Sequence, residues 1–200
     1  MKRSSDGEGR SIPKRNKGTF IITNENRWQK IGNDDYYVYC GGQVNEADKE
    51  RIVRVKIAEG VDCINNSPFG DDGTFENCRL LEDIEFLSPP TSSSSTLTCI
   101  CTRSFYNCSL LMTINIPSTV MVIGVSAFEN CTSLANVTLP RSLDIIMEKM
   151  FAHCRNLSSI VLPENCQEIH PDAFSGCSSL KSIIFPDSLL VIGSQVRVSF

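Results

Sequence analysis

A repeat of 23 residues constrains the fold of this chain more than any other feature of its sequence. Successive phenylalanines lie 23 residues apart, and one further phenylalanine precedes them by 30: Phe75, Phe105, Phe128, Phe151 and Phe174. A cysteine column (Cys78, Cys108, Cys131, Cys154, Cys177) and a leucine column (Leu81, Leu111, Leu134, Leu157, Leu180) keep the same register. Self-similarity in several columns at once is the signature of a repeat architecture.

Each unit also contains the pattern of a very short strand. Apolar residues occupy alternate positions three and five residues after each leucine: Ile84, Ile114, Val137, Ile160 and Ile183, then Phe86, Ile116, Leu139, Leu162 and Phe185. Proline then follows in four units and ends the strand, because it has no N–H to donate. Since 23 residues cannot bury their own apolar face, units must stack, each strand pairing with the next. The sequence therefore predicts an α/β, mostly β, right-handed solenoid of short parallel strands.

The residue before each repeated cysteine supports this interpretation independently. These residues are Asn77, Asn107, Asn130, His153 and Gly176. Asn, His and Gly are the residue types that most readily accept a positive φ. We expect a left-handed turn residue at each position, which gives His153 a conformational role rather than a chemical one.

The chain divides into three segments by composition. Residues 1–18 carry six Lys or Arg against two acids, a net charge of +4 with few apolar residues, and are expected to form a disordered basic tail. Residues 19–50 hold strand-like stretches at Phe20–Ile22 and Tyr36–Tyr39 and are expected, with Trp28, to cap the first repeat. Residues 51–200 are expected to form the repeat array.

The repeat resembles the BspA-type leucine-rich repeat family, whose unit reads AFxxCxxLxxIxLP over 23 residues. The clearest matches are residues 127–140 and 173–186, and the resemblance covers residues 52–200. It implies a right-handed leucine-rich repeat superhelix that binds other macromolecules through its strand face. Some relatives are surface adhesins, so an exported adhesin of this type is an alternative function.

Charge and targeting signals bear on partners and location. The net charge of −4 argues against nucleic acid as a partner, and no apolar run approaches a membrane span. No apolar stretch follows the basic N-terminal residues, as a secretory signal would require. We therefore expect an intracellular protein, cytoplasmic or nuclear, with the cysteine column as packed thiols. Clusters at Lys2–Arg3 and Lys14–Lys17 resemble a bipartite nuclear-import signal, which leaves a nuclear regulatory adaptor as a further alternative.

Signals of catalysis are poor, and we expect no enzyme, no cofactor and no metal. There are two histidines, and His170 has no obvious carboxylate or serine partner in the sequence. Cys99 and Cys101 form half of a metal-ligand motif, but zinc needs four ligands, and the two align with the ordinary turn positions Val122 and Gly124.

A binding surface is the better expectation. Residues between the core positions of a strand face outward. The two candidate columns are Asp83, Thr113, Asn136, Ser159 and Ser182, and Glu85, Asn115, Thr138, Val161 and Ile184. They run from acidic to apolar, and the outward placement of Val161 and Ile184 suggests a contact surface, although strand propensity alone also favours these residue types.

The expected function is thus a non-enzymatic scaffold that contacts a protein partner of unknown identity through this strand face. The unit that should begin after Ile192 departs from the repeat, because Arg197 occupies its phenylalanine place. Either residues 195–200 form a makeshift cap, or the last edge is exposed and self-association through this C-terminal edge is expected.

Overall fold

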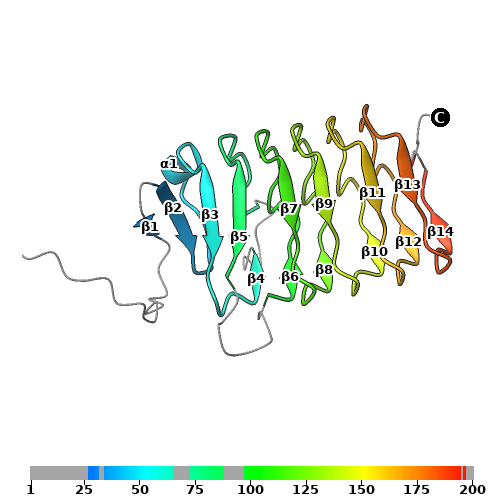
Figure 1. Ribbon diagram of the computed structural model, residues 1–200, viewed down its shortest axis with the longest axis horizontal. Coiled ribbons are helices and arrows are strands. Elements are labelled where there is room, and N and C mark those ends of the chain that lie inside the picture. Colours follow the sequence, from blue (N-terminus) through cyan, green and yellow to red (C-terminus); the bar gives the residue numbers. More distant parts are fainter. Residues whose placement is uncertain (1–26, 32–33, 65–72, 88–96, 195, 197–200) are drawn as a thin grey trace, which may run out of the picture.

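The computed structural model describes residues 27–31, 34–64, 73–87, 97–194 and 196. The basic tail, the strand expected at Phe20–Ile22 and the serine-rich insertion before Leu97 lie outside the described residues. Successive repeats lie side by side, and each contributes one strand to each of two rows (Figure 1). The predicted parallel pairing of short strands is confirmed.

The first row holds the strands that the I-x-L pattern predicts. They are β3 (Arg54–Ile57), β5 (Asp83–Phe86), β7 (Thr113–Asn115), β9 (Asn136–Thr138), β11 (Ser159–Val161) and β13 (Ser182–Ile184). Their register follows the repeat: Ile114 lies beside Val137, and Ile160 lies beside Ile183. Inward residues at alternate positions therefore stack on their counterparts in the next unit.

The second row consists of two-residue strands. They are β4 (Cys63–Ile64), β6 (Cys99–Ile100), β8 (Val122–Ile123), β10 (Ile145–Ile146), β12 (Glu168–Ile169) and β14 (Val191–Ile192). The second residue of each is the inward isoleucine, which is fully buried from Ile64 to Ile169 and is exposed at Ile192.

Turns close the third side of each unit, and the phenylalanine column lies inside them. Backbone N–H groups of these turns donate to the next repeat, as from Phe128 to Met150 and from Asn130 to Ala152. All five residues before the repeated cysteines have positive φ, from 60° to 73°. The expected left-handed turn is thus confirmed at every position, including His153.

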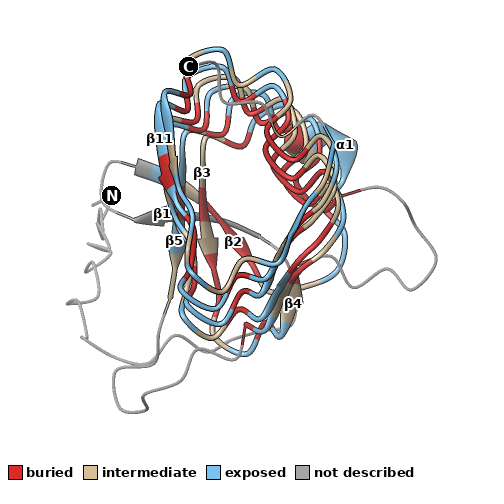
Figure 2. Ribbon diagram, turned by 90° about the vertical axis from the view of Figure 1, so that its right-hand side faces the viewer, coloured by how far each residue is buried: buried red, intermediate tan, exposed pale blue. Residues whose placement is uncertain are grey.

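The core runs continuously between the two rows and the turns, and Figure 2 shows it as the buried inner side of each unit. The cysteine column is part of it as free thiols, as expected. Each thiol from Cys108 onward donates to the carbonyl of the phenylalanine one repeat earlier, for example from Cys131 to Phe105 at 3.1 Å and from Cys154 to Phe128 at 3.2 Å. Cysteine fits here because it is small and apolar yet carries one weak donor for that buried carbonyl.

At the N-terminal end, β1 (Arg27–Ile31) pairs antiparallel with β2 (Asp34–Tyr39), and β2 extends the first row by pairing parallel with β3. Tyr37 and Tyr39 are buried, and the Tyr39 ring meets Phe75 edge-on at 5.1 Å, at the start of the phenylalanine column. The short helix α1 (Glu46–Lys49) begins at Asn45, whose side chain accepts from the Asp48 N–H. The described residues include no helix that is long and apolar enough to cross a bilayer.

Among the described residues, the last strand of each row has one free side. Within the described chain, β13 pairs with β11 and β14 pairs with β12, and neither has a neighbour on its other side. Phe185, Leu190, Val191 and Ile192 are all exposed there, Leu190 by 77%.

Candidate binding surface on the first strand row

The candidate site is the outward surface of β3, β5, β7, β9, β11 and β13, which we call the strand face. All ten sequence-predicted residues lie on it and are exposed: Asp83, Glu85, Thr113, Asn115, Asn136, Thr138, Ser159, Val161, Ser182 and Ile184. The alternation of buried and exposed residues along each strand places them there. The structure thus arranges the two predicted columns across five consecutive strands.

The N-terminal end of the strand face is of mixed charge, because basic residues of β3 lie beside Asp83 and Glu85, the acidic first members of the two predicted columns. Strand β3 pairs with β5 so that Arg54 lies beside Asp83 and Lys56 lies beside Glu85. The Lys56 Nζ is 2.7 Å from the Glu85 Oε2 and 4.4 Å from the centre of the Tyr36 ring. The charge of Glu85 is therefore compensated by Lys56, on the strand that precedes the two columns.

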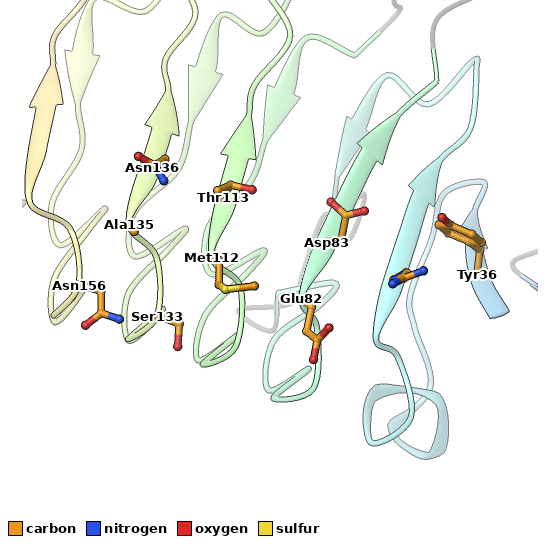
Figure 3. A pocket seen from close by; sticks show the side chains of 10 residues that line it. Tyr36, Glu82, Asp83, Met112, Thr113, Ser133, Ala135, Asn136 and Asn156 are labelled. Atoms are coloured by element: carbon orange, nitrogen blue, oxygen red, sulfur yellow. The ribbon is translucent and has the colours of Figure 1, made fainter. Parts of the chain in front are cut away.

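A shallow hollow of about 770 Å³ opens on this part of the strand face (Figure 3). Its lining residues are Tyr36, Arg54, Glu82, Asp83, Met112, Thr113, Ser133, Ala135, Asn136 and Asn156. Three of the predicted residues, Asp83, Thr113 and Asn136, line it together, whereas Val161 and Ile184 lie outside it. The hollow combines charged, amide and hydroxyl groups with an aromatic ring and an exposed thioether.

Toward the C-terminal end, the strand face changes from polar to apolar. The Thr138 hydroxyl lies 2.9 Å from the Asn115 amide oxygen and donates to it, so these two residues hold each other in place. Beyond them Val161 lies in register with Ile184, and the two side chains are 61% and 60% exposed. The outward placement expected for both is confirmed, and they form an apolar contact area bordered by the hydroxyls of Ser159 and Ser182.

Two kinds of residue that line the hollow could not be predicted from the repeat pattern. Tyr36 and Arg54 precede the regular repeat, and only the pairing of β2 with β3 and of β3 with β5 brings them beside Asp83. Ser133 and Asn156 lie in the turns two residues after the repeated cysteines, where the repeat pattern shows no preference. Val55, the residue after Arg54, precedes Ile84 by 29 residues, six more than one repeat, so the sequence gives only a weak signal for Arg54.

The second row carries two groups of chemically active side chains. His170 does have a carboxylate partner, contrary to the sequence analysis: its Nε2 is 3.2 Å from the Glu168 Oε2. Both side chains are more than a third exposed, as in an ordinary surface pair. Cys99 forms a disulfide with Cys63, and the Cys101 sulfur is 3.3 Å from that of Cys63.

Comparison with known proteins gives one family and several structural neighbours. The profile of the BspA type Leucine rich repeat region matches residues 71–196 in six copies. No curated protein sequence matches the chain at a significant level.

Among solved structures, a leucine-rich repeat protein from Bacteroides ovatus is 26% identical with a TM-score of 0.56, covering 84% of this chain and 46% of its own. The Treponema pallidum leucine-rich repeat protein is 26% identical with a TM-score of 0.51, covering 84% of this chain and 62% of its own. The pneumococcal vaccine antigen PcpA is 21% identical with a TM-score of 0.54, and the match covers 80% of this chain and 39% of PcpA. This likeness concerns the fold alone. The chain thus spans less than two thirds of the length of these proteins.

Proposed function

Because this chain belongs to the BspA-type leucine-rich repeat family, we propose that it is a non-enzymatic scaffold whose repeats form a right-handed solenoid and bind a protein partner through the strand face. Repeats of this family typically serve as scaffolds rather than as enzymes. The observation that carries the proposal is the exposed apolar pair Val161 and Ile184 on the same strand face as the hollow. Isolated apolar residues are common on surfaces, but an in-register apolar pair on such a face suits a macromolecular contact.

The test compares two double variants of equal chemistry. Replacing Val161 and Ile184 with Asp places two charges on the strand face. The control replaces Met121 and Val122 with Asp and places two charges on the second row, where Val122 lies in β8 and Met121 directly precedes it; the two are 53% and 59% exposed. The second variant should change the free energy of unfolding by no more than about 0.5 kcal/mol, and the first by up to about 1 kcal/mol, because its two aspartates lie in register on neighbouring strands and repel each other. Partner capture from the source cell, quantified by mass spectrometry, should fall for the first variant and not for the second. Equal capture by both would remove the strand face as the binding surface.

The intracellular location, cytoplasmic or nuclear, is part of this proposal. Its support is the column of free, buried thiols, which suits a reducing compartment. Imaging of a tagged full chain tests it. Loss of nuclear signal on deleting residues 1–18 would favour the nuclear regulatory adaptor.

A second candidate, the exported adhesin, is favoured by the Cys63–Cys99 disulfide, since disulfides persist mainly in oxidising compartments. If the protein is exported, Cys63 and Cys99 should resist alkylation in protein that is isolated without a reductant. The Asn-x-Ser/Thr sites, such as Asn136, should also carry glycans where the producing cell glycosylates exported proteins. Free thiols at both positions would exclude it.

The C-terminal edge is proposed as a self-association surface. Its support is the exposed apolar group at Leu190, Val191 and Ile192 beside two strands with unpaired edges among the described residues. Sedimentation velocity over a concentration series should show a dimer that Leu190→Glu abolishes. A monomer at every concentration would exclude this role.

A further inference from the structure

We propose that Cys63, Cys99 and Cys101, in their reduced state, form a binding site for a soft monovalent metal ion, Cu(I). The three residues lie at the N-terminal end of the second row, away from the strand face. Cys63 begins β4 and Cys99 begins β6, and the two are partners in the register of this parallel pair with their Cα atoms 4.7 Å apart. Cys101 follows Cys99 by two residues and so projects to the same side of the chain.

The geometry gathers three sulfurs at one point. The Cys101 sulfur is 3.3 Å from the Cys63 sulfur, and all three sulfurs lie within 4.8 Å of one another. Metal–thiolate bonds are about 2.3 Å long, so three thiolates around one ion lie about 4 Å apart. The cluster therefore needs only small side-chain rotations to surround an ion.

The number and type of the ligands favour copper over zinc. Structural zinc takes four protein ligands, and in the part of the chain that the structure describes this cluster offers three. Thiolates are soft ligands that select Cu(I), and three sulfurs complete the low coordination number that this ion accepts. A disulfide alone needs two cysteines and gives no reason for the third sulfur at 3.3 Å.

The oxidised and the metal-bound forms exclude each other. A dithiol or phosphine reductant supplies two electrons that break the Cys63–Cys99 bond, and two protons complete the thiols. Cu(I) then replaces the thiol protons, which pass to solvent, and no further electron moves.

Four of the five repeat cysteines are too deeply buried to compete for the ion, and the fifth, Cys177, is partly exposed but donates its thiol to the Phe151 carbonyl at 3.0 Å. Cys78, Cys108, Cys131 and Cys154 are fully buried inside the core, whereas the three cluster cysteines are partly exposed. Burial raises the pKa of Cys131 to about 12, which opposes formation of the thiolate that a metal needs. The site is therefore distinguishable within a chain of ten cysteines.

The experiment titrates the full chain, reduced with a phosphine under anaerobic conditions, with Cu(I) against a chromophoric Cu(I) chelator. We expect one tightly held ion per chain. Cys63→Ser, Cys99→Ser and Cys101→Ser should each lower the affinity more than about tenfold. Cys40→Ser is the matched control, because Cys40 is also partly exposed and lies outside the cluster, and it should bind as the unsubstituted chain does.

Two results of the titration would contradict the proposed site. The first is unchanged affinity in Cys101→Ser, which would mean that the third thiol is not a ligand. The second is equal loss in Cys40→Ser, which would mean nonspecific thiol binding. X-ray absorption of the unsubstituted copper-loaded chain gives the sulfur coordination number independently of how the variants fold, and a number other than three contradicts the proposal.

Discussion

The ring of Phe128 lies parallel to the ring of Phe151, with the ring centroids 5.5 Å apart and the planes 5° apart. Phe105 lies on the other side of Phe128 in the same way, at 5.5 Å and 4°. The separation is close to the spacing of neighbouring strands, because each repeat places its ring at the same point of the chain. The stack therefore joins neighbouring units through large, fully buried surfaces.

Phe128→Ala should destabilise the protein by about 3–5 kcal/mol, since it removes a buried ring and leaves a cavity between two others. Urea denaturation followed by circular dichroism measures this loss. Met121→Ala is the control, because Met121 is 59% exposed and its truncation should stay within about 0.5 kcal/mol. Similar losses in the two variants would contradict the structural importance of the ring column.

Asn130 should tolerate glycine better than alanine, the reverse of the usual order. Its φ is 62°, a conformation that costs an L-residue with a Cβ about 1–2 kcal/mol and costs glycine nothing. Gly176 occupies the same place in another repeat with φ 73°. Both substitutions lose the contact of the Asn130 amide with the Tyr106 hydroxyl at 3.2 Å, so that loss cancels in the comparison.

We expect Asn130→Ala to be less stable than Asn130→Gly by about 1 kcal/mol in thermal or urea unfolding. In ordinary helix or strand positions the alanine variant is the more stable one, by about 0.5–1 kcal/mol. An alanine variant as stable as the glycine variant would show that the turn relaxes out of the left-handed conformation.

The repeat pattern predicts most of the fold because each column has a separate physical reason. Buried phenylalanine and leucine, alternate β-branched residues and a turn residue with positive φ all point to the same unit. A second left-handed column was not predictable: Arg103, Ser126, Lys149 and Asp172 have φ between 54° and 58°. Of these residue types only aspartate favours that conformation, and the N–H of each residue donates to the next repeat, as from Ser126 to Glu148 at 3.0 Å, so contacts between repeats stabilise it.

The candidate site was predictable only where the repeat is regular. Alternation along the strands gives the outward columns from Asp83 to Ile184, but it does not give the pairing of Lys56 with Glu85. The cluster of Cys63 with Cys99 and Cys101 was equally hidden, because other units carry Val122, Ile145, Glu168 or Val191 at this position. Insertions of irregular length shift Cys63 out of the 23-residue register.

The cysteine column should make the protein sensitive to alkaline pH. Burial raises the pKa of Cys131 from 9.0 to about 12. The unfolded chain then loses its thiol protons first, so the contribution of these thiols to stability is constant below about pH 9 and falls as the pH rises above it. Between these two pKa values, each such thiol lowers the free energy of unfolding by up to about 1.4 kcal/mol for every pH unit of increase.

Urea titrations between pH 7 and pH 10.5 test this for Cys131→Ala. We expect a less steep alkaline decline than in the unsubstituted chain, whatever the loss at neutral pH, because one buried thiol is gone. Cys40→Ser removes a partly exposed thiol and should keep the original slope more closely. Identical slopes for Cys131→Ala and the unsubstituted chain would contradict the assigned cause.

Glu76 and Arg103 form an ion pair between neighbouring repeats, in which the Glu76 side chain is buried and that of Arg103 is 35% exposed. Arg103 donates from both Nη2 and Nε to the Glu76 carboxylate, the latter at 3.2 Å, and the Gly73 N–H adds a bond of 3.0 Å. The guanidinium carbon also lies 3.9 Å from the centre of the Tyr106 ring. Burial alone would raise the pKa of Glu76, but the bonds from Arg103 and Gly73 outweigh it and lower the pKa.

Arg103→Met should therefore destabilise the protein by about 1–3 kcal/mol at neutral pH, because it leaves a buried carboxylate without its partner. In the unsubstituted chain the pair stabilises the fold above the unfolded pKa of Glu76, near 4.5, and this contribution is lost as the pH falls through the lowered folded value. In Arg103→Met the carboxyl is better buried in its protonated form, so mild acid should recover part of the lost stability.

Adding Glu76→Gln to Arg103→Met should recover part of the lost stability at neutral pH. Urea unfolding of the single and double variants, at neutral pH and in mild acid, measures each effect. A double variant that is no more stable than Arg103→Met, with no recovery in acid, would show that the arginine acts through its packing on Tyr106 and not through its charge.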